Sequence, residues 1–179
     1  KLGYDYWKPV QAGLENTDGD FIRSHVANSK CVVHPEVYAL KTPASPHYAA
    51  EIDRVVIERE RIKLPKSSNS IVVETAGGLM SPLGDQYLNI DMIMQLDLPV
   101  VLVSNNYLGS INHTLLSVEA LKKRNISVIG IVFSGEEVSS SRSFILKHTG
   151  LPLLFSIPLM EVNKESIRTF AIRTAITWP

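Results

Sequence analysis

The sequence has 179 residues, a length typical of one compact domain, and its 18 basic and 18 acidic side chains give a formal net charge of zero. A nucleic-acid-binding protein usually has an excess of basic residues, and this chain has none. No apolar run approaches the roughly 20 residues that span a bilayer. The single cysteine, Cys31, excludes an internal disulfide framework and a multi-cysteine metal site. We therefore expect a cytoplasmic protein that forms one α/β domain over residues 1–179 and has no nucleic-acid or membrane partner.

The first part of the chain alternates short apolar runs with turn-rich stretches. In chain order, hydrophobic spacing and the positions of Pro and Gly predict a strand over residues 4–10 with a loop to Gly13, a helix over residues 18–28, a turn-rich stretch over 42–47 leading into a short helix, an exposed helix over 57–62, and a polar linker over 63–70.

The remainder of the chain carries uniformly apolar strands separated by segments with helical spacing. The predicted strands are residues 71–73, 98–103, 126–133 and 151–157. The predicted helices are residues 90–98, 111–124, 136–148 (closed by Gly150) and about 163–174, the last capped by Asn163. Strands this apolar are expected to be covered on both faces, as in parallel sheets. The alternation predicts the α/β class, with an open, mostly parallel sheet and helices on both faces.

Ligands of open parallel sheets collect at the carboxyl ends of the strands, so the residues that follow each strand are the candidate site. Glu74 leaves an apolar strand and is followed by the small residues Ala76, Gly77 and Gly78. An acid followed by small residues is what a Mg-nucleotide site needs, since Mg²⁺ prefers oxygen ligands. The alternative interpretation is a surface acid that caps a turn.

Three other positions carry similar alternatives. Lys8, at a strand end, is either a solvated lysine or a cation that stabilises a moving phosphoryl group. Asp18 and Asp20 are either a metal-binding pair or part of a turn or helix cap. The 108–113 loop begins a helix whose free N–H groups favour an anion, unless Ser110 is simply an N-cap.

Four sequence blocks, taken together and in this order, resemble the dethiobiotin synthetase family. They are YWKPVQAG from residue 6, PASPH from residue 43, VETAGGLMSPL from residue 73, and PVVLV followed by LGSINHTL from residues 99 and 108. The resemblance covers almost the whole chain and is fainter after residue 132.

This resemblance implies a P-loop NTPase-like fold, a homodimer, and an ATP-dependent cyclo-ligase of biotin biosynthesis that uses Mg²⁺. Enzymes of the family convert 7,8-diaminononanoate and CO₂ into dethiobiotin. One amine forms a carbamate, the carbamate takes the γ-phosphoryl group of ATP, and the second amine closes the cyclic urea and expels phosphate.

The motif match also implies roles for individual residues. Lys8 matches the catalytic lysine, and Asp18 and Glu74 match the metal-binding acids, with Asp20 as the fallback for Asp18. The remaining matches are the substrate-binding positions Ala12, Gly109, Ser110, Ile111 and Asn112, and the nucleotide-binding positions Thr75, Ala76, Gly77, Ser134, Gly135, Pro158, Leu159, Met160 and Glu165, in addition to Asp18 and Glu74.

The sequence departs from the family in three places. The G-x-x-x-x-G-K-[ST] loop, which lies about 20 residues before the Lys-Pro-Val block in the family, is absent because Lys8 is only seven residues from Lys1. We expect that the sequence is a segment of a longer protein; the alternative is a non-catalytic P-loop-like scaffold or partner subunit that has lost its phosphate cradle. Ala12 replaces a hydroxyl residue near the substrate. Ser134 replaces an adenine-reading asparagine, so we expect relaxed nucleotide selectivity.

Overall fold

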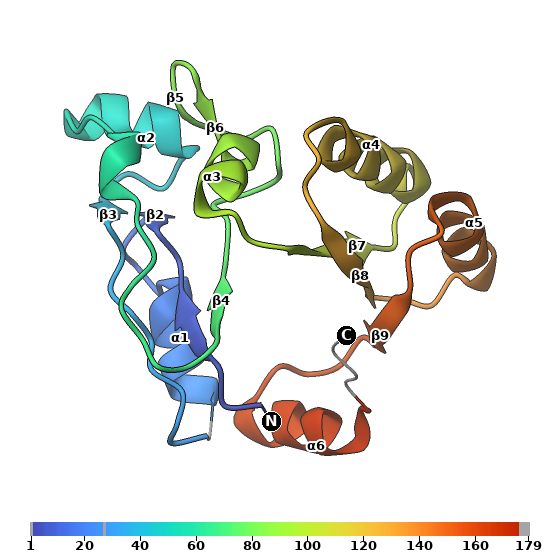
Figure 1. Ribbon diagram of the computed structural model, residues 1–179. Helices are drawn as coiled ribbons and strands as arrows, with labels where there is room; N and C mark the ends of the chain where they lie inside the picture. The colour runs from blue at the N-terminus through green and yellow to red at the C-terminus, as the bar shows by residue number, and fades with distance from the viewer. Residues whose placement is uncertain (1, 27, 176–179) are drawn as a thin grey trace. The chain divides into compact units, whose positions relative to one another are not determined.

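The computed structural model describes residues 2–26 and 28–175, and its contacts divide the chain into two compact units. The first unit comprises Lys1–Leu96 and Asn163–Arg168, and the second comprises Asp97–Val162 and Thr169–Pro179. Figure 1 shows strands and helices alternating along the chain in both. Compact units of this size occur within single domains as well as between domains, so the predicted single domain stays a prediction.

The first unit is built on short strand pairs. Its strands are β1 (Asp5–Trp7), β2 (Val10–Ala12), β3 (Tyr38–Leu40), β4 (Ile71–Val73), β5 (Pro82–Gly84) and β6 (Tyr87–Leu88). β1 pairs in parallel with β4 and β2 in parallel with β3, whereas β5 and β6 form an antiparallel hairpin. The carboxyl ends of β1 and β4 are therefore neighbours, which positions the residues that follow them.

The helices of the first unit are α1 (Asp18–His25), α2 (Pro46–Asp53), the 3₁₀ turn η1 (Arg59–Arg61) and α3 (Asn89–Leu96). They enclose one apolar core, whose largest fully buried side chains include Trp7, Leu40, Ile62, Leu83 and Met92. Trp7 belongs to this core, so β1 directs that side chain inward and its neighbour Tyr6 to the opposite face.

The second unit contains a three-stranded parallel sheet in the order β7 (Val100–Asn105), β8 (Val128–Ser134) and β9 (Leu153–Ile157). Its crossover helices are α4 (Ser110–Lys123) and α5 (Ser139–Thr149). The buried side chains Ile131, Phe133 and Ile145 form its core. Strand–helix–strand connections with parallel pairing confirm the predicted α/β class.

The last helix, α6 (Lys164–Arg173), begins where the sequence predicts. The Asn163 Oδ1 accepts hydrogen bonds from the backbone N–H groups of Glu165 and Ser166, which satisfies two donors that lack an intrahelical acceptor. Asn163 therefore caps this helix.

Several local predictions were wrong. The single strand expected over residues 4–10 ends at Trp7, the loop expected up to Gly13 contains most of β2, and neither β3 nor the β5–β6 hairpin is predicted. The exposed helix expected over residues 57–62 is only the turn η1, and Ile62 is completely buried. Val72 in β4 and Val103 in β7 are 49% and 61% exposed, so the expectation that these strands are covered on both faces does not hold there.

Candidate active site

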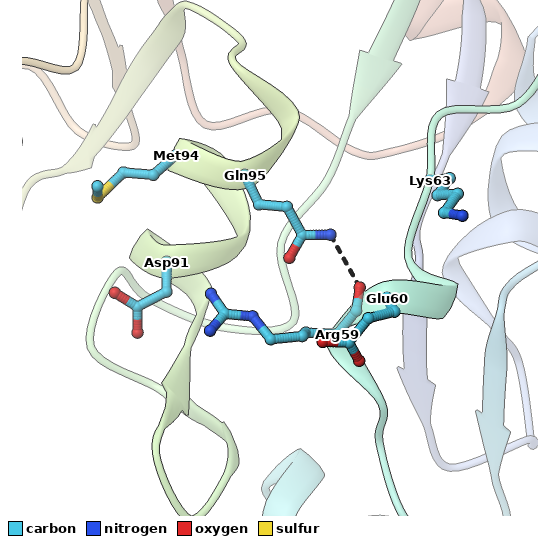
Figure 2. Close-up of a pocket in the computed structure, with 6 residues that line it drawn as sticks. All are labelled: Arg59, Glu60, Lys63, Asp91, Met94 and Gln95. Carbon is cyan, nitrogen blue, oxygen red and sulfur yellow. Dashed lines mark hydrogen bonds between the residues drawn. The ribbon is translucent and has the colours of Figure 1, made fainter.

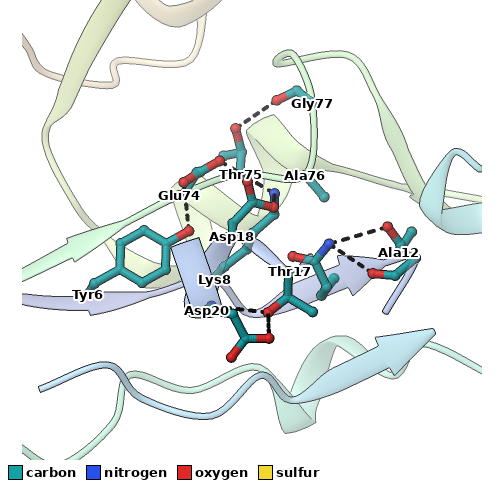
Figure 3. A network of polar contacts seen from close by, with 12 residues as sticks. Tyr6, Lys8, Ala12, Thr17, Asp18, Asp20, Glu74, Thr75, Ala76 and Gly77 are labelled. Atoms are coloured by element: carbon teal, nitrogen blue, oxygen red, sulfur yellow. Dashed lines mark hydrogen bonds and ion pairs between the residues drawn. The ribbon is translucent and has the colours of Figure 1, made fainter. Parts of the chain in front are cut away.

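Three charged side chains of the first unit converge where β1 and β4 end. The Lys8 Nζ lies 2.5 Å from the Asp18 Oδ2 and 3.4 Å from the Glu74 Oε1 (Figure 3). Lys8 is 9% exposed, whereas the Asp18 and Glu74 side chains are 43% and 45% exposed. The cluster thus has a buried ammonium and two carboxylates that solvent, or a ligand, can reach.

The local structure explains why these residues meet. Trp7 is opposite Val73 in the parallel β1–β4 pair, and the Glu74 N–H donates to the Trp7 carbonyl oxygen, so Lys8 and Glu74 leave the two strands side by side. Asp18 is the first residue of α1, which begins at its N-cap Thr17. A carboxylate in the first turn of a helix interacts favourably with the helix dipole.

Asp20, the fallback for Asp18, belongs to the helix cap instead. Its Oδ2 accepts a hydrogen bond from the Thr17 hydroxyl at 2.8 Å, and its Oδ1 lies 2.7 Å from Arg23 Nη1. The hydrogen bond from Thr17, assisted by Arg23, lowers the pKa of the Asp20 carboxyl. The structure therefore brings Asp18, and not Asp20, to Lys8.

Tyr6 joins the cluster, although it is not among the residues selected from the sequence. The buried Tyr6 hydroxyl donates to the Glu74 Oε2 at 2.6 Å (Figure 3). Burial, together with the hydrogen bond to Glu74, raises the pKa of Tyr6, so the hydroxyl stays protonated at neutral pH. The available signal was the two-residue spacing of Tyr6 and Lys8, which places both on one face of the strand.

The loop after Glu74 is held by its own hydrogen bonds and by a buried amide. The Thr75 hydroxyl donates to the Gly77 carbonyl oxygen at 2.7 Å. Asn89, which is completely buried at the start of α3, donates from Nδ2 to the carbonyl oxygens of Ala76 and Gly78 at 2.9 and 3.0 Å. Asn89 is a second residue of this site that sequence reasoning missed.

Ala12 lies at the end of β2, in a turn fixed by its neighbour. The Gln11 Nε2 donates to the carbonyl oxygens of Ala12 and Gly13 at 3.3 and 3.1 Å. Gly13 has a φ of +82°, and a Cβ there would meet the Cβ of Pro43 at 3.1 Å, so the turn requires glycine. The main chain at Ala12 is consequently fixed.

The 108–113 loop lies in the second unit and begins α4. Gly109, with a φ of +107°, is the N-cap, and Ser110 is the buried first residue of the helix, so the alternative of Ser110 as N-cap is wrong. The Ser110 and His113 N–H groups donate to Tyr107 and Gly109 carbonyl oxygens. The Ile111 and Asn112 N–H groups have no intrahelical acceptor, and such groups attract anions.

The predicted base-binding residues follow β8 and β9. The Gly135 N–H donates to the Ile157 carbonyl oxygen, which joins the ends of β8 and β9, and the Asn106 N–H donates to the Ser134 carbonyl oxygen, which joins the ends of β7 and β8. After β9 come Pro158, Leu159 and Met160, of which Leu159 is 73% exposed. Glu165 is exposed at the start of α6.

The first unit also has a hollow of about 550 Å³ outside this cluster. Figure 2 shows it between the segment around η1 and helix α3, lined by Arg59, Glu60, Lys63, Asp91, Met94 and Gln95. The Gln95 Nε2 donates to the Arg59 carbonyl oxygen at 2.8 Å and closes one side. None of the residues selected from the sequence lines it.

Within the described part of the chain, Asp18 and Glu74 are the acidic residues that the structure brings to Lys8, and no group of three or more His, Cys, Asp or Glu side chains is arranged to hold a metal. Mg²⁺ is commonly held by one or two carboxylates together with phosphate oxygens and waters. The two half-exposed carboxylates fit that ligand set. Over residues 2–26 and 28–175, no helix is long and apolar enough to cross a membrane.

Comparisons with known proteins identify the family of this chain. The family described as AAA domain matches residues 1–165. The chain is 47% identical over 179 residues to the ATP-dependent dethiobiotin synthetase BioD of Cytophaga hutchinsonii, an alignment that covers 99% of this chain and 87% of that protein. It is 51% identical over 147 residues to the BioD of Christiangramia forsetii (82% and 70% covered) and 37% identical over 179 residues to that of Chlamydia pneumoniae (99% and 80%). The chain belongs to the family of the ATP-dependent dethiobiotin synthetases.

Proposed function

We propose that this protein is an ATP- and Mg²⁺-dependent dethiobiotin synthase, a cyclo-ligase of biotin biosynthesis. The observation that carries the proposal is the convergence of Lys8 with Asp18 and Glu74, in a chain of this family. The reaction consumes 7,8-diaminononanoate, CO₂ and ATP, and releases dethiobiotin, ADP and phosphate. We further propose a cytoplasmic homodimer.

The chemistry has three steps in which Lys8 would act on developing negative charge. One amine of the diamine attacks CO₂ and loses a proton, which gives a carbamate. A carbamate oxygen attacks the γ-phosphorus of ATP and displaces ADP. The second amine attacks the carbonyl carbon of the mixed anhydride, expels phosphate and closes the ring. A fixed ammonium in a buried position stabilises both the carbamate and the transferring phosphoryl group.

Asp18 and Glu74 would hold the Mg²⁺ ion. When bound, the ion neutralises charge on the phosphate oxygens during phosphoryl transfer. The structure supports this role because the two carboxylates face the same ammonium from the start of α1 and the end of β4, and both remain accessible. The net charge of the three side chains is negative by one, which suits a cation.

The remaining assignments concern substrate and nucleotide. We assign the carboxylate of the diamine to the helix start formed by Gly109, Ser110, Ile111 and Asn112, where N–H groups without an intrahelical acceptor and the helix dipole favour an anion. We assign a further substrate contact to Ala12. We assign the nucleotide to Thr75, Ala76 and Gly77, and its base to Ser134, Gly135, Pro158, Leu159, Met160 and Glu165. Because a serine hydroxyl replaces a two-sided amide at residue 134, we expect ATP, GTP and CTP to compete more evenly.

The test is dethiobiotin formation by the full-length protein, measured by mass spectrometry with 7,8-diaminononanoate, bicarbonate and Mg-ATP. We expect Lys8→Ala to lower turnover by at least about 100-fold, because it removes a preorganised charge at the reacting groups. Lys66→Ala, in the exposed polar linker, is the matched control and should retain activity. An active Lys8→Ala variant would refute the role of Lys8, and an inactive wild-type protein would favour the non-catalytic scaffold.

A further inference from the structure

The two carboxylates of the site share the lysine unequally. The Asp18 Oδ2 is 2.5 Å from the Lys8 Nζ, whereas the nearer oxygen of Glu74 is 3.4 Å away. An ammonium has three donors and contacts carboxylates at about 2.7–2.9 Å when nothing opposes the approach. The contact of Glu74 with Lys8 is therefore the looser of the two.

Tyr6 provides Glu74 with a second hydrogen bond. Its hydroxyl donates to the second oxygen of Glu74, Oε2, at 2.6 Å, which is the short distance expected for a donor to a charged acceptor. Tyr6 lies in β1 and Lys8 directly follows that strand, so the two side chains contact the two oxygens of a single carboxylate from nearby positions in the chain. Figure 3 shows the Tyr6 hydroxyl and Lys8 approaching Glu74 from different sides.

The consequence concerns what Glu74 can bind. Each carboxylate oxygen has two lone pairs, and Tyr6 occupies only one of those on Oε2. The Glu74 side chain is 45% exposed, so its unoccupied lone pairs face solvent. A closer Glu74–Lys8 pair would occupy the carboxylate and neutralise the lysine at once.

We propose that Tyr6 is a positioning residue whose hydroxyl holds Glu74 away from Lys8 and keeps that carboxylate available to a divalent cation. This inference rests on the proposed function, in which Glu74 is a ligand of Mg²⁺. It extends the site by a residue that acts through Glu74 and need not touch the nucleotide or the diamine.

The experiment compares two variants in which a buried tyrosine loses its hydroxyl group. Tyr6→Phe removes the hydroxyl and keeps the ring. Tyr87→Phe is the matched control, because Tyr87 is equally buried in the same unit and its hydroxyl donates to the Gln95 Oε1 at 2.9 Å, outside the site. Mn²⁺ alone is titrated into the full-length proteins and its binding is followed by electron paramagnetic resonance; turnover is then measured against Mg²⁺ concentration.

We expect Tyr6→Phe to weaken Mn²⁺ binding by about 10-fold, within the range typical of lost hydrogen bonds to metal ligands. More Mg²⁺ should be needed for half-maximal turnover, while turnover at saturating Mg²⁺ is largely retained. Tyr87→Phe should bind Mn²⁺ like the wild-type protein. Equal Mn²⁺ affinities for the two variants would overturn the role of Tyr6.

Glu74→Gln separates this inference from the proposed function. If Tyr6 acts through Glu74, the effect of Tyr6→Phe should disappear in the Glu74→Gln background. A persisting effect overturns the inference alone. If Glu74→Gln itself leaves Mn²⁺ affinity unchanged, the metal assignment under the proposed function fails, and the inference fails with it.

Discussion

Asp18 and Asp20 lie two residues apart in the first turn of α1, yet their carboxylates have different partners. Asp18 pairs with Lys8, whereas Asp20 accepts from Thr17 and pairs with Arg23. Helical residues two positions apart do not share a face, so one turn can serve both a cap and a site. The two residues consequently offer a clean comparison.

We expect Asp18→Asn to lower turnover by about 100-fold, because it removes a charge at the reacting groups. Asp20→Asn should retain turnover and lower only the melting temperature, because the Asp20 carboxylate belongs to the cap of α1 and not to the site. Steady-state rates and thermal melts of both variants check this. If Asp20→Asn were the inactive variant, the ligand assignment would pass to Asp20.

How far the sequence predicts the site depends on how local each signal is. Lys8 and Glu74 follow strands, and the rule for open sheets selects strand ends directly. Asp18 and Asp20 were not separable, because which of them serves the cap depends on side-chain geometry. Tyr6 resembles an ordinary core residue of a strand, and Asn89 an ordinary residue of a helix start. Both act through contacts with residues far away in the sequence.

The secondary-structure elements, too, are predicted well where the signal is local in the sequence and poorly where distant contacts decide the structure. Long periodic segments such as α4, and α5 with its C-cap Gly150, lie close to their predicted positions. The short strand β3 was missed because three residues carry too little periodicity, and its parallel partner β2 is distant in sequence. The predicted helix over residues 57–62 failed because Ile62 is drawn into the core of the first unit. Tertiary burial outweighed local helical spacing there.

Two glycines of the second unit allow the cost of overpacking and the cost of backbone strain to be measured separately. A Cβ on Gly130, in β8, would lie 2.7 Å from the Pro152 carbonyl oxygen, whereas a Cβ on Gly150 would meet nothing within 4 Å but would sit at a φ of +69°. We expect Gly130→Ala to destabilise the protein by about 2–3 kcal/mol through overpacking. Gly150→Ala should lower the free energy of unfolding by about 1 kcal/mol, because alanine is strained in the left-handed backbone conformation.

Urea unfolding of the two glycine variants measures these costs. β8 is the central strand of its sheet, so a shift of the backbone at residue 130 would be transmitted to its hydrogen bonds with both neighbours. If Gly130→Ala proved as mild as Gly150→Ala, the strand would have to move away from Pro152 without losing its pairing. The close approach of β8 and β9 would then not constrain this position.

For the whole molecule, the charge balance bears on how stability depends on pH. With 18 basic and 18 acidic residues, the net charge is zero at pH 7, so electrostatic self-repulsion is small there. As the pH falls, carboxylates lose their charge and 5 histidines gain theirs. Individual carboxylates that are bonded in the folded state then determine where stability is first lost.

Asp5 is a carboxylate of the first unit with several hydrogen-bond donors. It is buried, and its oxygens accept from the Val32 N–H and the Asn69 side chain at 3.0 Å and from the Ser67 hydroxyl at 2.7 Å; the His34 Nε2 lies at 2.9 Å. These bonds, the Val32 N–H first, hold the pKa of the Asp5 carboxyl well below its usual value of 3.8. Asp5 thereby ties β1 to two segments that are distant in sequence.

Because the folded-state pKa of Asp5 lies below the unfolded-state value, its carboxylate stabilises the fold above about pH 4, and that stabilisation is lost as the pH falls through the folded-state pKa. We expect Asp5→Asn to have a lower melting temperature than the wild-type protein at pH 6, with a difference that shrinks toward pH 3. Ser67→Ala removes one of the hydrogen-bond donors to Asp5 and should lower the melting temperature in the same way, to a smaller degree. Asp85→Asn is the control, because Asp85 is an exposed carboxylate between β5 and β6. Melts recorded from pH 3 to pH 7 decide the matter, since a difference independent of pH would mean that Asp5 contributes through packing and not through its charge.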